Sequence, residues 1–395
     1  MRLKLVFACP LLLICSVPRL AQCQKIDGVY RGTLGKQAIV LEIGIDPQQQ
    51  GGRYLVGEYF YRRYGVGISI KEMRMKDDSF LLEESGGNQT APRQWKLKFD
   101  DNVASGSFCK CDLENALPGQ AKLLPIYLER VSSDFDPNFD LVSPNAYSDS
   151  LLDFPLTTSP DVTKTGYAYA MMTDSRFKTS MPRITRFPDA PVMMKINMQL
   201  QKQLKEFRLE AANCLQHGRV NTIGDFDIST TVELFSRHLM SVVREGGLYC
   251  GGAYPGYYLS VNTFDLDSGT EPTVAYLLAR EMDPDALKKL VKKDDEITSK
   301  SEISRIEATS RIAAELYLQH HTPYEKECGD VFNRDQSGAP DFTTIQYLSE
   351  KGLIIIPDLP HVVQVCADPL LIPYDELRPL LKPNSQFLDL VGAAH

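Results

Sequence analysis

The sequence lacks the motifs that carry common enzymatic chemistry. It contains no Gly-x-Ser-x-Gly elbow, no His-Glu-x-x-His helix, no Walker loop and no Gly-x-Gly-x-x-Gly turn. With 51 Asp and Glu residues, a carboxylate pair for glycosidase chemistry can always be proposed, but it has no weight without the distance between the two groups. We therefore assign no catalytic residue, no metal ligand and no cofactor, and the binding residues stay unassigned.

The chain also lacks a basic block and, beyond its N-terminus, a long apolar run. Its 43 Lys and Arg residues give a net charge of −8, which argues against nucleic acid as a partner, because the phosphate backbone needs clustered cations. No segment after the N-terminus is apolar for long enough to cross a membrane as a helix. The 43% of hydrophobic residues indicate a folded protein, and the 395 residues predict two or three domains.

The N-terminus is predicted to be a signal peptide. A basic start, Met1–Lys4, precedes an apolar run of 13 residues from Leu5 to Val17, well below the ~20 residues that span a bilayer. Cleavage after Cys23 leaves a periplasmic or secreted chain without a transmembrane helix. A second interpretation is a lipoprotein box over residues 20–23, with Cys23 acylated. Loss of residues 1–23 removes three basic residues, so the net charge falls from −8 to −11; such a surface favours basic partners, or serves solubility alone.

Six cysteines remain after the leader, and an even number in an exported chain predicts disulfides. Cys214 with Cys250 and Cys328 with Cys366 are the expected pairs, since each pair lies within one proposed domain. Cys109 and Cys111 would then close a tight ring or bind a ligand; a metal site there needs two further ligands nearby. The six candidates are Cys109, Cys111, Cys214, Cys250, Cys328 and Cys366.

Residues 26–130 are predicted to form an all-β domain. Short segments rich in β-branched and aromatic residues alternate with turns, which is typical of an antiparallel sheet, barrel or sandwich. The expected strands are 28–33, 38–45, 54–61, 67–73, 80–83, 95–99, 104–108 and 124–128. One of them carries Tyr59, Phe60 and Tyr61, followed by Arg62, Arg63 and Tyr64; this cluster either stacks on sugars or supplies the two faces of one strand.

Residues 131–165 are rich in Ser, Asp, Pro and Thr and are predicted to be a linker. Residues 166–395 then form an α+β domain with an antiparallel sheet and helices. Apolar residues at helical spacing predict a helix over 193–215, and further helices are expected at 273–280 and 374–381. Strands are expected over 166–174, 178–186, 227–246 with His238 inside it, 257–266, 343–348, 353–356 and 361–366.

Two stretches carry motifs that are more specific than the periodicity of strands and helices. Gly251-Gly252-Ala253-Tyr254-Pro255 is followed by Thr263-Phe264-Asp265-Leu266-Asp267-Ser268-Gly269. Tyr347–Leu353 is followed by Leu371–Leu377. Together they resemble the extracytoplasmic domain of unknown function found in the lysozyme-sensing anti-sigma factor RsiV and in proteins with polysaccharide deacetylase domains. The resemblance covers about residues 165–385.

The resemblance implies a binding role outside the cytosol, with a lysozyme-like muramidase as the sharpest candidate partner. Tyr254 stands where the family has His, so the resemblance does not imply a His-dependent role at this turn. The residues themselves favour a structural role for this motif. Gly251 and Gly252 permit positive φ or close chain approach, and Pro255 restricts the backbone that follows them.

Three hypotheses follow. The first is an exported, noncatalytic envelope protein that binds a protein or peptidoglycan-related ligand. The second is an envelope hydrolase or esterase acting on cell-wall polysaccharide. The third is a structural or assembly factor of the envelope. Oligomeric state is left open.

Overall fold

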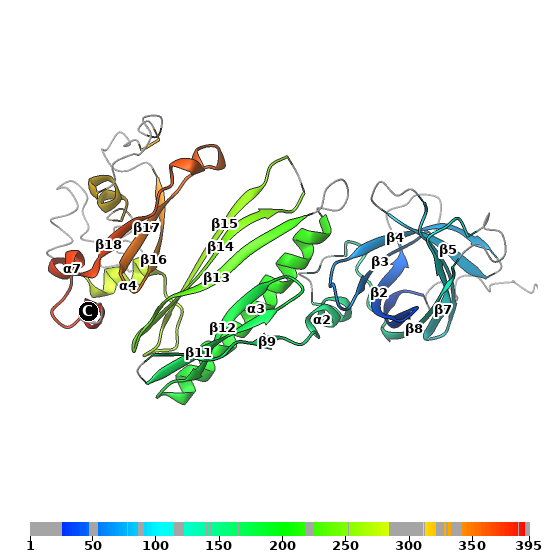
Figure 1. Ribbon diagram of the computed structural model, residues 1–395, viewed down its shortest axis with the longest axis horizontal. Coiled ribbons are helices and arrows are strands. Elements are labelled where there is room, and N and C mark those ends of the chain that lie inside the picture. Colours follow the sequence, from blue (N-terminus) through cyan, green and yellow to red (C-terminus); the bar gives the residue numbers. More distant parts are fainter. Residues whose placement is uncertain are drawn as a thin grey trace, which may run out of the picture. The chain divides into compact units, whose positions relative to one another are not determined.

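The chain divides into two compact units, Met1–Asp153 and Phe154–His395, which we describe separately. The computed structural model (Figure 1) describes residues 26–46, 54–76, 78–85, 91–113, 122–139, 141, 144–164, 166–217, 224–251, 253–283, 311, 313–320, 328, 331–332, 342–385 and 387–391. The predicted leader, with Cys9, Cys15 and Cys23, lies outside these residues. The predicted fold class is confirmed: an antiparallel all-β region precedes a region of sheets and helices.

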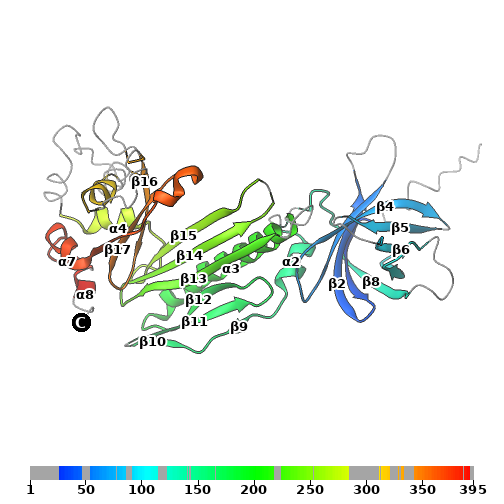
Figure 2. The same ribbon diagram turned by 45° about the horizontal axis from the view of Figure 1, so that its top comes forward.

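The first unit is a closed barrel in which each strand pairs antiparallel with the next and the last returns to the first (Figure 2). All eight predicted strands are present. They are β1 Gly28–Leu34, β2 Gln37–Ile45, β3 Leu55–Tyr61, β4 Ile68–Lys76, β5 Ser79–Glu84, β6 Gln94–Asp100, β7 Val103–Cys109 and β8 Leu124–Ser132. Because β1 pairs with β8, no strand of the barrel is left with an unpaired edge.

Large side chains fill the barrel interior. Trp95, Tyr30 and Tyr59 are fully buried there, with Leu41 and Ile43 between them. Within β2 these inward residues alternate with outward ones, as the two-residue period of a strand requires. The interior is therefore a packed core.

Residues within the predicted linker have structure of their own. Helix α2, Ala146–Leu152, begins with Asn145, whose side chain accepts the Ser148 N–H, and it buries Tyr147 and Leu151. Two short strands follow, β9 Thr157–Thr158 and β10 Val162–Lys164, and both pair with β11. The composition of 131–165 predicted a linker because it has few apolar residues, but Leu141, Tyr147 and Leu151 among them are buried.

The second unit begins with a sheet and a long helix. Strands β11 Tyr167–Asp174 and β12 Thr179–Arg186 pair, and helix α3, Ala190–His217, follows. The helix then packs on the sheet of β13 Asp225–Phe235, β14 Leu239–Tyr249 and β15 Gly256–Asp265 (Figures 1 and 2). Ile196, Leu200 and Leu204 lie on one face of α3 and contact Met240, Val242 and Phe264 of the sheet.

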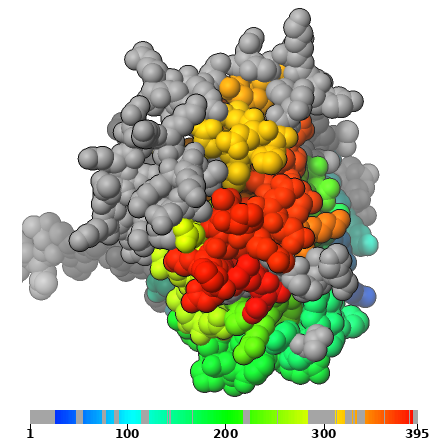
Figure 3. All heavy atoms as spheres, turned by 90° about the vertical axis from the view of Figure 1, so that its left-hand side faces the viewer, coloured from blue at the N-terminus to red at the C-terminus, as the bar shows by residue number. Residues whose placement is uncertain are grey.

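The C-terminal part has its own core. It contains α4 Val274–Glu281, β16 Thr343–Leu348, β17 Gly352–Asp358, β18 Leu370–Pro373, α7 Tyr374–Leu377 and α8 Leu388–Val391. Leu348, Leu353 and Leu377 pack against Leu316 and Tyr317. Figure 3 shows this face, with the orange and red C-terminal residues against the yellow segment around residues 313–320.

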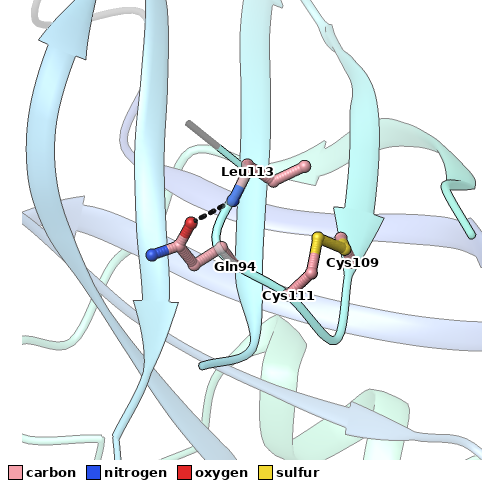
Figure 4. Close-up of a disulfide and its surroundings, with 4 residues drawn as sticks. All are labelled: Gln94, Cys109, Cys111 and Leu113. Carbon is pink, nitrogen blue, oxygen red and sulfur yellow. Dashed lines mark hydrogen bonds between the residues drawn. A yellow bond between two sulfur atoms is a disulfide. The ribbon is translucent and has the colours of Figure 1, made fainter. Parts of the chain in front are cut away.

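The structure pairs the six cysteines as expected. Cys214 binds Cys250, Cys328 binds Cys366, and Cys109 closes the short ring with Cys111. Beside that ring, the side-chain oxygen of Gln94 accepts the Leu113 N–H at 2.8 Å (Figure 4). Disulfides of this number are typical of chains that fold outside the reducing cytosol.

Three predicted elements differ from the structure. Residues 361–366 form the 3₁₀ helix η3, His361–Cys366, which follows Pro360, and not a strand. Val362 and Val365 suggested a buried strand in the sequence, but both are exposed. His238 lies in the turn between β13 and β14, outside both strands. The predicted helix 374–381 is split into α7 and the 3₁₀ turn η4, Arg378–Leu380, because Pro379 lacks an N–H.

Among the described residues, no helix combines the length and the apolar character that a bilayer crossing requires. The predicted helix at 273–280 is present as α4, whose N-cap is Thr273. Most of residues 284–341 lie outside the described residues.

Candidate functional site

The sheet β13–β15 has one face covered by α3 and another that is open in part: six of its positions are exposed, whereas Val243 is buried. On β13, Phe226 and Ile228 are buried, while the alternating Asp225, Asp227 and Ser229 are exposed. Phe226 meets Phe207 of α3 in an aromatic pair, which fixes the side that the apolar residues take. Strand alternation therefore directs the acidic residues to the opposite side. We call this side the open face; its strand positions are Asp225, Asp227, Ser229, Thr231, Glu233, Val243, Glu245, Gly247, Tyr249, Tyr257, Leu259 and Val261.

The strand register aligns residues of the three strands in rows across the open face. Asp227 lies opposite Gly247, which in turn lies opposite Tyr257. A Cβ added to Gly247 would meet no atom within 4 Å, so this position exposes bare backbone between a carboxylate and an aromatic ring. A partner side chain can lie flat there without moving the sheet.

Tyrosine hydroxyls and carboxylates are hydrogen bonded across the open face. Tyr257, 51% exposed, donates its hydroxyl to Glu245 Oε2 at 3.2 Å. Thr231 donates to Glu233 Oε1 at 2.8 Å. Burial raises the pKa of the Tyr347 hydroxyl to about 12, with further contributions from Glu233, Glu245 and Tyr257, which places this β16 residue beside the same carboxylates.

Charge on the open face has a single sign. None of its strand positions is a lysine or an arginine, whereas four are carboxylates. The neighbouring turn is held by the Glu350 N–H, which donates to the Glu233 carbonyl at 2.9 Å, and Glu350 itself pairs with Lys164. Carboxylates beside tyrosines are suited to binding Lys or Arg side chains, through charge and through the ring faces.

The predicted structural motif lies at the end of this sheet. Gly251, Tyr254 and Pro255 belong to the connection between β14 and β15, and Gly252 lies outside the described residues. Gly251 has φ +88°, a backbone conformation that favours glycine, and Tyr254 is 78% exposed. Next to it, Cys250 is joined to Cys214 of α3. These placements suit the expected role in chain geometry, which stays a prediction.

The motif Asp265–Gly269 forms a turn in which a carboxylate accepts backbone N–H groups. Asp265 accepts the N–H groups of Asp267 and Ser268 and the Arg280 guanidinium at 2.9–3.1 Å. Burial alone raises the pKa of Asp265, but Arg280 and the two N–H groups outweigh it, so the pKa is lowered. Gly269, with φ +66°, completes the turn.

The barrel does not bring its predicted aromatic cluster together as a sugar platform. Tyr59 points into the core, where its hydroxyl donates to Glu84 at 2.5 Å, and Phe60 is buried on the other side of β3 against Tyr147. Tyr64 is exposed, but the Arg63 guanidinium lies 4.4 Å from its ring centroid. The residues thus supply the two faces of one strand and a short turn.

His238 joins two turns and a helix. Its Nδ1 lies 2.7 Å from Asp267 and its Nε2 lies 3.1 Å from Asp389 of α8. His238 thus links the turn before β14 to the turn after β15 and to α8. Among the described residues, no group of three or more His, Cys, Asp and Glu side chains is placed to hold a metal ion.

Sequence reasoning did not single out Asp225, Asp227, Glu233 or Glu245. Single acidic residues carry no signal in a chain with 51 of them. The available signal was the Asp-Phe-Asp-Ile alternation at 225–228, which is typical of a strand with one polar face.

No family model matches the chain, and no curated protein matches it. Among solved structures, a member of the DUF3298 family from Bacteroides fragilis is similar to it, with a TM-score of 0.32 and 14% identity; the match covers 60% of this chain and 97% of that one. A TM-score this low does not establish a common fold. The membership of the chain in a family stays a prediction from its motifs.

Proposed function

We propose that the chain is an exported, noncatalytic protein of the cell envelope that binds a basic protein through the open face of β13–β15. The observation that carries this proposal is the composition of that face: carboxylates and tyrosines surround bare backbone at Gly247, and no strand position bears a cation. The net charge of the whole chain, −8, acts in the same direction by steering basic partners toward it.

A lysozyme-like muramidase is the first partner to test, because the sequence motifs resemble a domain that senses lysozyme. Such enzymes are commonly basic, which suits an acidic, tyrosine-bearing face. A peptidoglycan-related ligand is the alternative that the same experiment separates, since an uncharged glycan does not depend on carboxylates.

The test is a titration of the disulfide-bonded chain, beginning at Gln24, with lysozyme at low and at high salt. We expect binding that weakens at least about tenfold when Glu233 and Glu245 are both changed to Gln, because two charges facing a basic partner are lost. The matched control is Asp161→Asn with Glu206→Gln, which removes two exposed carboxylates elsewhere in the second unit. Absence of binding at high micromolar concentration, or equal affinity of both double variants, would refute the proposal.

A further inference from the structure

Two glutamates form a buried pair on the outside of the barrel. Glu42 on β2 lies directly opposite Glu58 on β3, and their side chains are 0% and 1% exposed. Their neighbours Leu41 and Tyr59 belong to the interior core, so alternation directs both glutamates outward. Directly opposite residues have Cβ atoms roughly 5 Å apart, and burial raises the cost of ionising carboxyl groups placed there.

The pair is buried because the chain after β8 lies over it. We call residues 134–139, 141 and 144–152 the cover segment. Tyr147 of α2 packs edge-on against Phe60, with ring centroids 5.0 Å apart, and the Phe135 ring occupies the space that a side chain at Gly44 would need. The cover segment therefore removes water from Glu42 and Glu58.

Hydrogen bonds link the cover segment to both glutamates. The Tyr147 hydroxyl donates to Glu58 Oε1 at 3.0 Å, and the Asp136 N–H donates to Glu42 Oε1 at 3.0 Å. Glu42 Oε2 is buried and has no hydrogen-bond partner among the described residues. A proton on that oxygen removes one charge and gives it a hydrogen to donate.

Among the described residues, the charge that acts on Glu42 is negative. From the cover segment, the carboxylate of Asp136 adds negative charge near Glu42. On β1, Arg31 donates its Nε to Ser150 Oγ at 2.9 Å. From β3, Tyr59 directs its hydroxyl to Glu84 inside the barrel. A proton on Glu42 thus removes charge from a buried site that already faces the Asp136 carboxylate.

We propose that Glu42 and Glu58 form a proton-operated latch, which holds the cover segment on the barrel while one proton is bound and releases it when both carboxylates ionise. Release transfers that proton from the glutamate pair to solvent and opens the chain that precedes Phe154, the first residue of the second unit.

The direction of the pH effect follows from the pKa of Glu42. Burial, as the largest cause, and the Asp136 carboxylate raise this pKa from its ordinary value of 4.5 to about 7, although the Asp136 N–H opposes them. A raised carboxyl pKa means that the closed state holds the proton more tightly than the open state does. Closure is therefore fully stable below pH 4.5 and loses stability as the pH rises through about 7.

Hydrogen exchange of the full, disulfide-bonded chain tests the latch. After correction for intrinsic rates, we expect amides of the cover segment to exchange at least about tenfold faster at pH 8.5 than at pH 5.5, as roughly one pKa unit of linkage implies. The barrel strands should keep their protection. In Glu42→Gln, which cannot ionise, the difference should fall below about twofold.

Controls separate the latch from a general effect of charge. Glu129→Gln removes an exposed carboxylate on β8 and should behave like the unmodified chain. Fluorescence of Trp95, the single tryptophan, reports whether the barrel of each variant is folded. If the Glu42 variant fails to fold, Glu58→Gln takes its place. Equal protection of the cover segment at both pH values, or an unchanged pH response in the folded Gln variants, would overturn the proposal.

Discussion

Acidic residues on the outside of the barrel and on the sheet β13–β15 differ in how far they are exposed. On the barrel, Glu42 and Glu58 are fully buried beneath the cover segment. On the sheet of the second unit, Asp225 and Asp227 stay exposed opposite α3. Burial raises the cost of ionisation and with it the pKa of Glu42, while carboxylates on an exposed face are accessible to cationic partners. The same residue type thus serves a conformational equilibrium in one place and recognition in the other.

The largest predicted effect concerns the covered side of the second sheet. Cys214 and Cys250 join α3 to the end of β14 across 36 residues of sequence. Changing both to Ser should destabilise the second unit by about 3–4 kcal/mol, because the unfolded chain gains the freedom that the crosslink removes. The measurement is thermal unfolding followed by circular dichroism.

Trp95 fluorescence serves as the control for that experiment, because this residue lies inside the barrel and should report an unchanged transition. The double change of Cys109 and Cys111 to Ser, which opens a ring across one intervening residue, should cost much less. If the barrel transition shifted in the Cys214 and Cys250 variant, the stabilising effect of this disulfide would not be confined to the second unit.

A matched pair of glycines compares the covered and open faces directly. A side chain at Gly44 would overlap the Phe135 ring, whereas one at Gly247 would meet nothing within 4 Å. Gly44→Val should therefore cost about 2 kcal/mol by lifting the cover segment, as overpacking does elsewhere. Gly247→Val should change stability by less than about 0.5 kcal/mol.

Denaturant unfolding of both glycine variants checks this pair, with hydrogen exchange to locate the loss. The open-face variant should instead reduce partner affinity, since it fills the flat position between Asp227 and Tyr257. Equal destabilisation by the two substitutions would show that the second face is covered as well.

A smaller effect is expected from Tyr147→Phe, which removes the hydroxyl that donates to Glu58. Loss of a donor to a buried carboxylate costs roughly 1–2 kcal/mol when the carboxylate is ionised. The cost should therefore be larger at pH 8 than at pH 5. Opening of the cover segment, measured by hydrogen exchange at the two pH values, checks this; a cost independent of pH would argue against ionisation of the pair.

Much of the fold could be predicted from the sequence, for local reasons. The barrel strands alternate apolar and polar residues between clear turns, and Ile196, Leu200 and Leu204 mark the inner face of α3. Closure of β1 on β8 could not be predicted, because register between strands far apart in sequence leaves no local pattern. The error at residues 361–366 has the opposite cause: two valines suggested a strand, although both are exposed in η3.

The candidate site was harder to predict than the fold. The motif residues Gly251 and Tyr254 lie in the connection between β14 and β15, but they gave no indication of the carboxylates on the adjoining strands. The carboxylates become part of a candidate site only through the strand register, which places Asp227, Gly247 and Tyr257 in one row. Likewise, Glu42 and Glu58 are 16 residues apart in sequence and form a pair only because β2 and β3 align them.

One comparison tests the central claim most directly: lysozyme binding and pH-dependent hydrogen exchange in Glu233→Gln/Glu245→Gln beside Glu42→Gln/Glu58→Gln. Each double variant removes two carboxylates, so any difference reflects where they lie. We expect the first to lose at least about tenfold in affinity and keep the pH response, and the second to keep its affinity and lose the pH response. Equal effects of the two variants on both measurements would contradict the account.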